Sequence, residues 1–150
     1  MTKDVIITIR GLQFVQDEED MEPVEVVTTG EYYKKNGWHY LLFEEAVEGY
    51  EDTTHNVIKF REDHLEVRKK GLIQVHMVFE ENKKTISFYQ TPFGVMNMGI
   101  ATTNIQVQEG QKQLELLVNY ALDLNENYVA DCNIYLRVNA KEDGNFCLES

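Results

Sequence analysis

Short segments in which apolar and polar residues alternate with a period of two make up most of this chain. Such alternation, in segments rich in Val, Ile, Thr, Tyr and Phe, is typical of β-strands with two different faces. The pattern predicts strands over residues 5–15, 24–35, 38–48, 54–60, 64–70, 73–80, 84–91, 95–108, 112–124 and 128–138. We expect about nine or ten strands and no helix, and residues 95–108 could form one strand or two.

The breaks between these segments are short and contain turn residues. Asn36-Gly37 is a strong indication of a two-residue type I′ turn between adjacent antiparallel strands. Gly11 interrupts the first segment, where a bulge or a bend is expected. Pro23 and Pro92 both fall between segments, where a missing backbone N–H costs no hydrogen bond of a sheet.

One segment, residues 112–124, fits two patterns. Leu114, Leu117 and Leu122 belong to a helical stripe, but every second residue from position 114 to position 124 is also apolar. The uninterrupted alternation favours a strand.

Consecutive strands joined by short breaks predict an antiparallel meander. Closing the meander into a barrel removes the exposed edges that so many strands would otherwise leave. We therefore predict an all-β fold, a single antiparallel up-and-down β-barrel of about eight to ten strands, with a β-sandwich as the alternative. No shift in composition divides the chain, so residues 1–150 are expected to form one domain, with a core over 5–138 and a loose tail over 141–150.

The net charge limits which kinds of partner the protein can bind, and the cysteine content indicates its cellular compartment. A formal net charge of −12 repels both the phosphate backbone of nucleic acids and anionic membrane surfaces, so we expect neither as a partner. Two cysteines, Cys132 and Cys147, are too few for a disulfide framework, and no segment has the length of a membrane span or the form of a signal peptide. A soluble cytoplasmic protein is expected.

Several short motifs, in their order and spacing, resemble a known family. They are Tyr40-Leu41-Leu42-Phe43-Glu44-Glu45, Asp52-Thr53-Thr54, Val67-Arg68-Lys69-Lys70-Gly71, Met77-Val78-Phe79, Tyr89-Gln90-Thr91-Pro92-Phe93-Gly94, Thr102-Thr103, Leu114-Glu115-Leu116 and Tyr120-Ala121-Leu122. Together they resemble the YwiB-like family of uncharacterised small bacterial proteins. The resemblance covers about residues 5–138, and its weight comes from the joint order of the motifs.

The resemblance implies a calycin-type β-barrel, similar in build to lipocalins and fatty-acid-binding proteins. It implies no known reaction, and it favours a strand over residues 112–124. One departure is that Ala130 and Cys132 stand where the family favours a Ser-x-Asn pair in the last strand.

A barrel of this size either fills with side chains or holds one small ligand. If it holds a ligand, a few polar groups are needed to orient it, and Arg68, His76, Tyr89 and Thr91 are candidates because neighbouring strands carry them. The resemblance marks Arg68, Tyr89 and Thr91 as family positions.

Tyr135 and Arg137 form a second candidate pair, because alternation places both on one face of the last strand. Fatty-acid-binding proteins hold a carboxylate with an Arg and a Tyr two residues apart, here in reversed order. The alternative is that both residues belong to a solvated outer face, as polar residues that alternate with apolar ones usually do.

No catalytic, metal or cofactor site is indicated. The four histidines, His39, His55, His64 and His76, lie on four different segments without metal-ligand spacing, and are expected to be surface or satisfied core residues. Glu44 and Glu45 point to opposite faces of a strand, so they cannot act together as a carboxylate pair, although either could pair with Arg68.

The sequence favours two hypotheses for the function. The first is a non-catalytic protein that binds a small apolar or amphiphilic ligand in the barrel. The alternative is a filled barrel that acts as a protein-interaction module or as a subunit of a homo-oligomer, with an exposed patch around Phe93, Met96 and Met98. An enzyme is the least favoured hypothesis, and it would need a pocket that holds Arg68, His76 and a carboxylate within hydrogen-bond reach.

Overall fold

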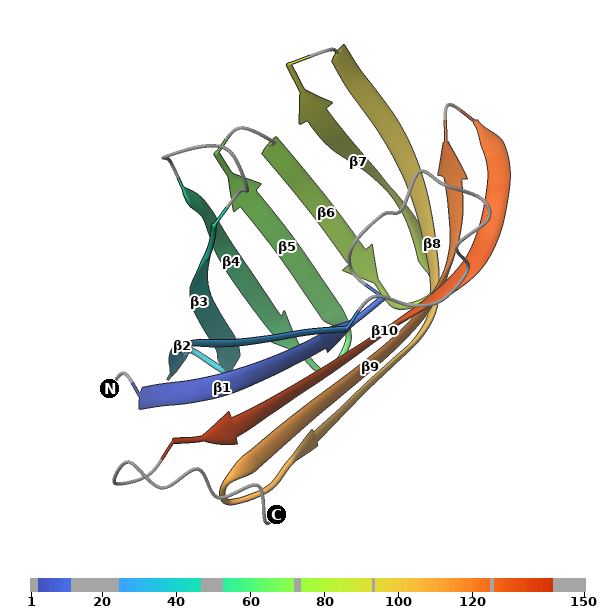
Figure 1. Ribbon diagram of the computed structural model, residues 1–150. Helices are drawn as coiled ribbons and strands as arrows, with labels where there is room; N and C mark the ends of the chain where they lie inside the picture. Colours follow the sequence, from blue (N-terminus) through green and yellow to red (C-terminus); the bar gives the residue numbers. More distant parts are fainter. Residues whose placement is uncertain are drawn as a thin grey trace.

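The computed structural model describes residues 3–11, 25–46, 53–71, 74–92, 94–124 and 126–141. They form ten strands (Figure 1): β1 (Lys3–Arg10), β2 (Glu25–Lys35), β3 (Trp38–Ala46), β4 (Thr53–Arg61), β5 (His64–Lys70), β6 (Gln74–Glu80), β7 (Lys83–Thr91), β8 (Gly94–Glu109), β9 (Gln113–Leu124) and β10 (Asn127–Ala140). None of the described residues belongs to a helix that is long and apolar enough to cross a membrane.

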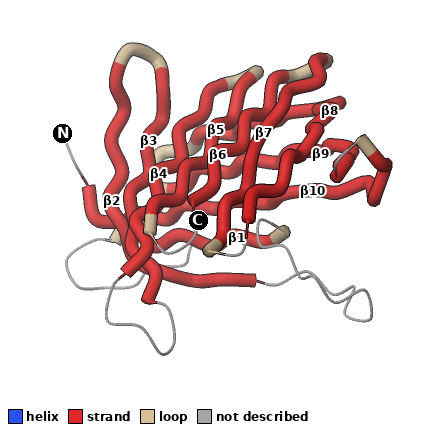
Figure 2. The backbone as a smooth tube through the Cα atoms, turned by 90° about the horizontal axis from the view of Figure 1, so that it is seen from above, coloured by secondary structure: helices blue, strands red, loops and turns tan. Residues whose placement is uncertain are grey.

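The strands form a closed barrel in which each strand pairs antiparallel with its neighbours in the sequence. The first and last strands close it, with β1 paired to β10 from Val5 opposite Ala140 to Arg10 opposite Tyr135. Figure 2 shows the strands following one another around the barrel. The prediction of an all-β up-and-down barrel is confirmed over the β-sandwich alternative.

The local predictions can be compared with the strands. Asn36 and Gly37 have φ values of 53° and 82°, as a type I′ turn requires. Residues 95–108 lie within a single strand, β8, whose register shifts between Thr102 and Asn104. Gly11 ends β1 with a φ of 86°, whereas the predicted continuation over residues 12–15 lies outside the described residues.

The ambiguous segment is a strand, β9, as predicted. Its inward residues Leu114, Leu116, Val118, Tyr120 and Leu122 are all buried, and the residues between them are only partly buried. The period of two therefore indicated the burial of each face correctly.

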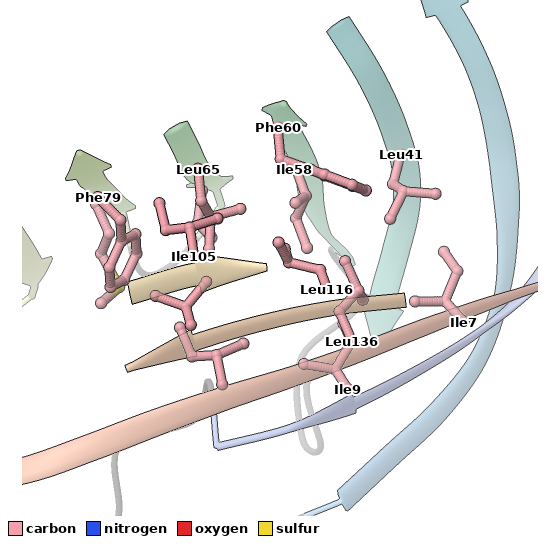
Figure 3. Packing of buried hydrophobic residues seen from close by; sticks show 14 of the residues in the cluster. Ile7, Ile9, Leu41, Ile58, Phe60, Leu65, Phe79, Ile105, Leu116 and Leu136 are labelled. Carbon is pink, nitrogen blue, oxygen red and sulfur yellow. The ribbon is translucent and has the colours of Figure 1, made fainter. Parts of the chain in front are cut away.

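The middle of the barrel is filled with apolar side chains. Figure 3 shows Phe60, Leu65 and Phe79 facing Ile105 and Leu116 from the opposite wall. The largest side chains with almost no accessible surface are Phe60, Phe79, Ile7, Leu41, Ile58, Leu65, Met77, Met98, Ile100, Leu116, Ile134 and Leu136. These side chains form a close-packed apolar middle of the barrel.

Met98 corrects the prediction of an exposed patch. Its side chain is fully buried in the barrel, while Met96 is partly buried and Phe93 lies outside the described residues. Met96 lies on the same inward face of β8 as Met98, which belongs to the core, so the two do not form an outer surface.

The contact between β6 and β7 is unusual. Backbone pairing is confined to one end, where Gln74, Val75 and His76 lie opposite Gln90, Tyr89 and Phe88. Toward the connecting turn, hydroxyl groups of β7 replace the ladder. Ser87 Oγ accepts a hydrogen bond from the Val78 N–H at 3.0 Å, and Thr85 Oγ1 donates one to the Val78 carbonyl oxygen.

Candidate functional site

Four of the six residues predicted as ligand anchors point away from the barrel interior. Arg68 alternates with the buried Val67 on β5, and His76 alternates with the buried Val75 and Met77 on β6. Both therefore lie on the outer face. The expectation that they could orient a ligand inside the barrel needs correction, because strand alternation alone did not indicate which face is inside.

Tyr135 and Arg137 are also on the outer face, since Ile134, Leu136 and Val138 occupy the core. The two side chains are partly buried, and the Arg10 guanidinium lies 5.4 Å from the centre of the Tyr135 ring.

Tyr89 is the predicted anchor that points inward, where it packs against the apolar core. Burial raises the pKa of its phenol above the ordinary value. Thr91 is the last residue of β7, and its side chain lies outside the described part of the structure.

A group of polar residues faces inward at the end of the barrel where Tyr89 lies. We call this group the polar end, and it consists of Glu45, Thr54, Asn56, Lys69 and Tyr89. Its members lie on β3, β4, β5 and β7, and the register from β3 to β7 brings them together. Asn56 lies opposite Lys69, Glu45 lies opposite Thr54, and Val75 lies between Lys69 and Tyr89 on neighbouring strands.

Charges in the polar end are paired. Lys69 Nζ lies 2.9 Å from Glu45 Oε1, and 16% of the Lys69 side chain and 24% of the Glu45 side chain are exposed. The predicted pairing of Glu44 or Glu45 with Arg68 is therefore wrong in its partner, because Glu45 pairs with Lys69 and Glu44 lies 3.0 Å from His55. Arg68 instead lies 3.5 Å from Glu66.

Asn56 carries an unsatisfied acceptor. The residue is 1% exposed, and its Nδ2 donates a hydrogen bond to the Thr54 carbonyl oxygen at 3.4 Å. Within the described residues its Oδ1 has no hydrogen-bond partner. Turning the amide around would place Oδ1 against the Thr54 carbonyl oxygen, so the present orientation is the one that the contact supports. A buried acceptor of this kind usually finds a donor in a protein, a water molecule or a ligand.

Sequence reasoning missed Asn56 and Lys69, although the pattern contained a signal. Leu65, Val67 and Lys69 occupy one face of β5, so a charged residue continues a face that begins with two core residues. On β4, Asn56 similarly interrupts an inward face that includes Ile58 and Phe60. Polar residues on an apolar strand face could have been selected as candidates for this reason.

A second polar cluster lies at the opposite end of the barrel. Tyr32 Oη and His39 Nδ1 are hydrogen-bonded at 2.7 Å, and His39 Nε2 lies 3.8 Å from Glu109 Oε1. His39 is the satisfied core histidine that the sequence allowed for. Burial lowers its pKa, and the nearby Glu109 only partly opposes this effect. A hollow of about 610 Å³ adjoins Glu109 along the connection between β8 and β9.

Comparisons with known proteins agree with the fold. The model of a family described as "Domain of unknown function (DUF1934)" matches residues 7–136. The uncharacterized beta-barrel protein YwiB of Bacillus subtilis (strain 168) is 24% identical over 126 residues, which cover 84% of this chain and 87% of YwiB. A crystal structure of the YwiB protein from Bacillus subtilis has a TM-score of 0.75 at 20% identity, covering 93% of this chain and 92% of the other.

Proposed function

The chain belongs to the DUF1934 family, and we propose that it is a non-catalytic protein that binds a small amphiphilic molecule at the polar end of its barrel. The observation that carries this proposal is the buried Asn56 Oδ1, which lacks a hydrogen-bond partner among the described residues and lies beside a charged pair. An unpaired buried acceptor costs about 1–3 kcal/mol, a cost that a bound donor would remove.

The chemistry of the polar end defines the ligand. A hydroxyl or N–H group would donate to Asn56 Oδ1 once a neighbouring side chain moves aside, because Asn56 is 1% exposed in the free protein. An anionic or carbonyl group would accept from the Lys69 ammonium. Val75 lies between Lys69 and Tyr89, so the apolar part of the molecule would contact Val75 and the Tyr89 ring. Because the middle of the barrel is filled, this apolar part should be short.

Native mass spectrometry of the gently purified, untagged protein tests the proposal. We expect the folded ion to carry an additional mass that is absent after denaturation. The Lys69→Met variant should lose this mass, because the substitution removes the inward-facing ammonium. Lys70→Met is the matched control, since Lys70 is the next residue on the same strand and is exposed on the outer face.

A Lys69→Met protein that retains the bound mass would contradict the proposal, as would a wild-type protein that carries no additional mass. Near-ultraviolet circular dichroism of both variants would establish that each is folded. The calycin type of the barrel, its single-domain organisation and a cytoplasmic location stay predictions.

A further inference from the structure

The outer face of β4, β5 and β6 differs in charge from the rest of the chain. Its strand residues include four cations, Lys59, Arg61, Arg68 and Lys70, and two anions, Glu66 and Glu80. With neutral histidines these strand residues carry a net charge of +2, against −14 for the other residues of the chain. The turn between β4 and β5 adds Glu62 and Asp63, and Asp63 Oδ1 lies 3.3 Å from Arg61 Nε. The surplus positive charge therefore lies at the other end of the face, at Arg68 and Lys70. A cationic face therefore lies on a strongly acidic protein.

Glu66 lies among the cations of this face, but its single negative charge does not neutralise them. The Glu66 side chain is 18% exposed, and its carboxylate lies 2.8 Å from His76 Nε2, 3.5 Å from Arg68 Nη2 and 3.6 Å from Lys59 Nζ. His64 Nε2 lies 3.7 Å away. One carboxylate thus faces two permanent cations, and the Arg68 side chain remains 61% exposed to an external acid.

An apolar strip adjoins the cations on β7 and β8. Phe88 lies opposite His76 in the register, and the two rings are 6.2 Å apart. Ile86 is 72% exposed and Val95 is 61% exposed, both on the outer face. Arg68, His76 and Phe88 form one cross-strand row, so positive charge passes directly into exposed apolar surface. We call the combined surface the cationic-apolar face.

Nucleic acid fits this face poorly. The aromatic rings beside the cations are already in contact with other groups, since Lys59 Nζ and Arg61 Cζ lie 4.8 and 4.4 Å from the centre of the Trp38 ring. Tyr33 and Tyr40 stack on each other at 4.7 Å. These three rings therefore offer bases no free stacking platform, and the −14 charge of the remaining chain would repel a long polyphosphate.

We propose that the cationic-apolar face docks a segment of a partner protein that combines acidic residues with large apolar residues. Acidic groups of the segment would pair with Arg68, Lys70 and Lys59, and its apolar side chains would cover Ile86, Phe88 and Val95. Charge complementarity accelerates the encounter and sets its orientation, and burial of the apolar strip contributes affinity. This site is independent of the polar end, which lies inside the barrel.

The probe is a fluorescent synthetic peptide of alternating Glu and Leu or Phe residues, followed by anisotropy with the full-length protein. We expect saturable binding that weakens as salt is added, because salt screens exposed charges. Arg68→Ala and Ile86→Ser should each weaken binding by roughly fivefold. Lys141→Ala is the matched control, because it removes an exposed cation elsewhere on the chain and should leave binding unchanged.

Four results would overturn the proposal. The first is an absence of peptide binding, and the second is a loss of peptide affinity in Lys141→Ala as large as that in Arg68→Ala. The third is tighter binding of an oligonucleotide that has the same charge as the peptide. The fourth is a wild-type dimer in light scattering that Arg68→Ala converts to a monomer. The last result would assign the face to a second copy of this chain. Circular dichroism of the variants, whose substituted side chains are exposed, would show that folding is retained.

Discussion

Asn56 places a polar amide in an interior that is otherwise suited to apolar side chains. If its Oδ1 is kept for a ligand, the free protein is less stable than it could be. We expect Asn56→Leu, which has a similar volume, to raise the free energy of unfolding by about 1 kcal/mol and to abolish the bound mass. Urea denaturation measures the first effect. Asn133→Leu, at an exposed position of β10, should show no such gain.

A loss of more than about 1 kcal/mol in Asn56→Leu would contradict this interpretation. It would show that the Asn56 amide is already hydrogen-bonded in the free protein and stabilises the fold, so that Oδ1 is not kept for a ligand.

His39 should make stability depend on pH. Burial lowers its pKa below the ordinary value of 6.5, so the unfolded chain binds the proton more readily. Stability is therefore fully present above about pH 6.5 and falls as the pH drops below it. His39→Phe retains an aromatic ring against Phe60, which lies 4.9 Å away, and should flatten this dependence.

Urea midpoints measured on both sides of pH 6.5 provide the test, with His55→Phe as a control because His55 is exposed. An unchanged slope in His39→Phe would contradict the assignment. The pH range in which His39 changes the stability differs from the range in which Glu66 does. Burial alone would raise the pKa of Glu66, but its hydrogen bond with His76 and the nearby cations lower it, so its contribution to stability is lost only as the pH falls below 4.5.

At the scale of single residues, the sequence identified polar residues but did not show on which face of the barrel each of them lies. It selected Arg68, His76, Tyr135 and Arg137 for their polar groups, and all four lie on the outer face. For Tyr135 and Arg137 this agrees with the outer-face alternative that the alternation of the last strand offered. The alternation of a strand separates two faces but does not label them unless the apolar face is clear. The outer face of β5 and β6 was ambiguous in this respect, because Val78 adds an apolar residue to it.

At the scale of elements, the junction of β6 and β7 depends on hydroxyl groups. Ser87→Ala would leave the Val78 N–H without its acceptor at a partly buried position. We expect a loss of about 1–2 kcal/mol and faster hydrogen exchange of the Val78 amide. The Val67 amide, in the regular ladder of β5, is the internal reference and should keep its protection. Unchanged protection of Val78 would contradict the role of Ser87.

Alanine substitutions at two glycines with positive φ distinguish the cost of backbone strain from the cost of steric overlap. A Cβ at Gly37 would meet no atom within 4 Å, whereas a Cβ at Gly11 would lie 2.1 Å from the Asn133 carbonyl oxygen. Gly37→Ala should therefore cost about 1 kcal/mol, and Gly11→Ala about 3 kcal/mol or more. Thermal unfolding of the two variants measures the difference, and equal losses would contradict the close approach of β1 and β10.

The elements themselves were largely predictable, because period-two alternation and the Asn36-Gly37 turn are local signals. The side-chain junction between β6 and β7 was not, since Thr85 and Ser87 look like ordinary strand residues until their register with Val78 is known. Likewise, alternation could not show that residues 95–108 form one strand with a register shift near Thr102.

At the scale of the whole molecule, closure of the barrel explains how one chain can carry two distinct surfaces. The inward faces of the strands form a filled apolar middle and the polar end, while the outward faces of β4 to β8 form the cationic-apolar face. Closure was predictable from the number of strands and their short connections. The filling of the middle was not, because it depends on how side chains from opposite walls meet.

The central claim is that this barrel is filled in its middle and receives a small molecule at the polar end. A high-resolution crystal structure of the gently purified, untagged protein tests it most directly. We expect density for a small molecule within hydrogen-bond distance of Asn56 Oδ1 and Lys69 Nζ, and close-packed side chains around Phe60 and Leu116. A ligand or water-filled cavity in the middle of the barrel, or an Asn56 Oδ1 bonded to the protein itself, would contradict the claim.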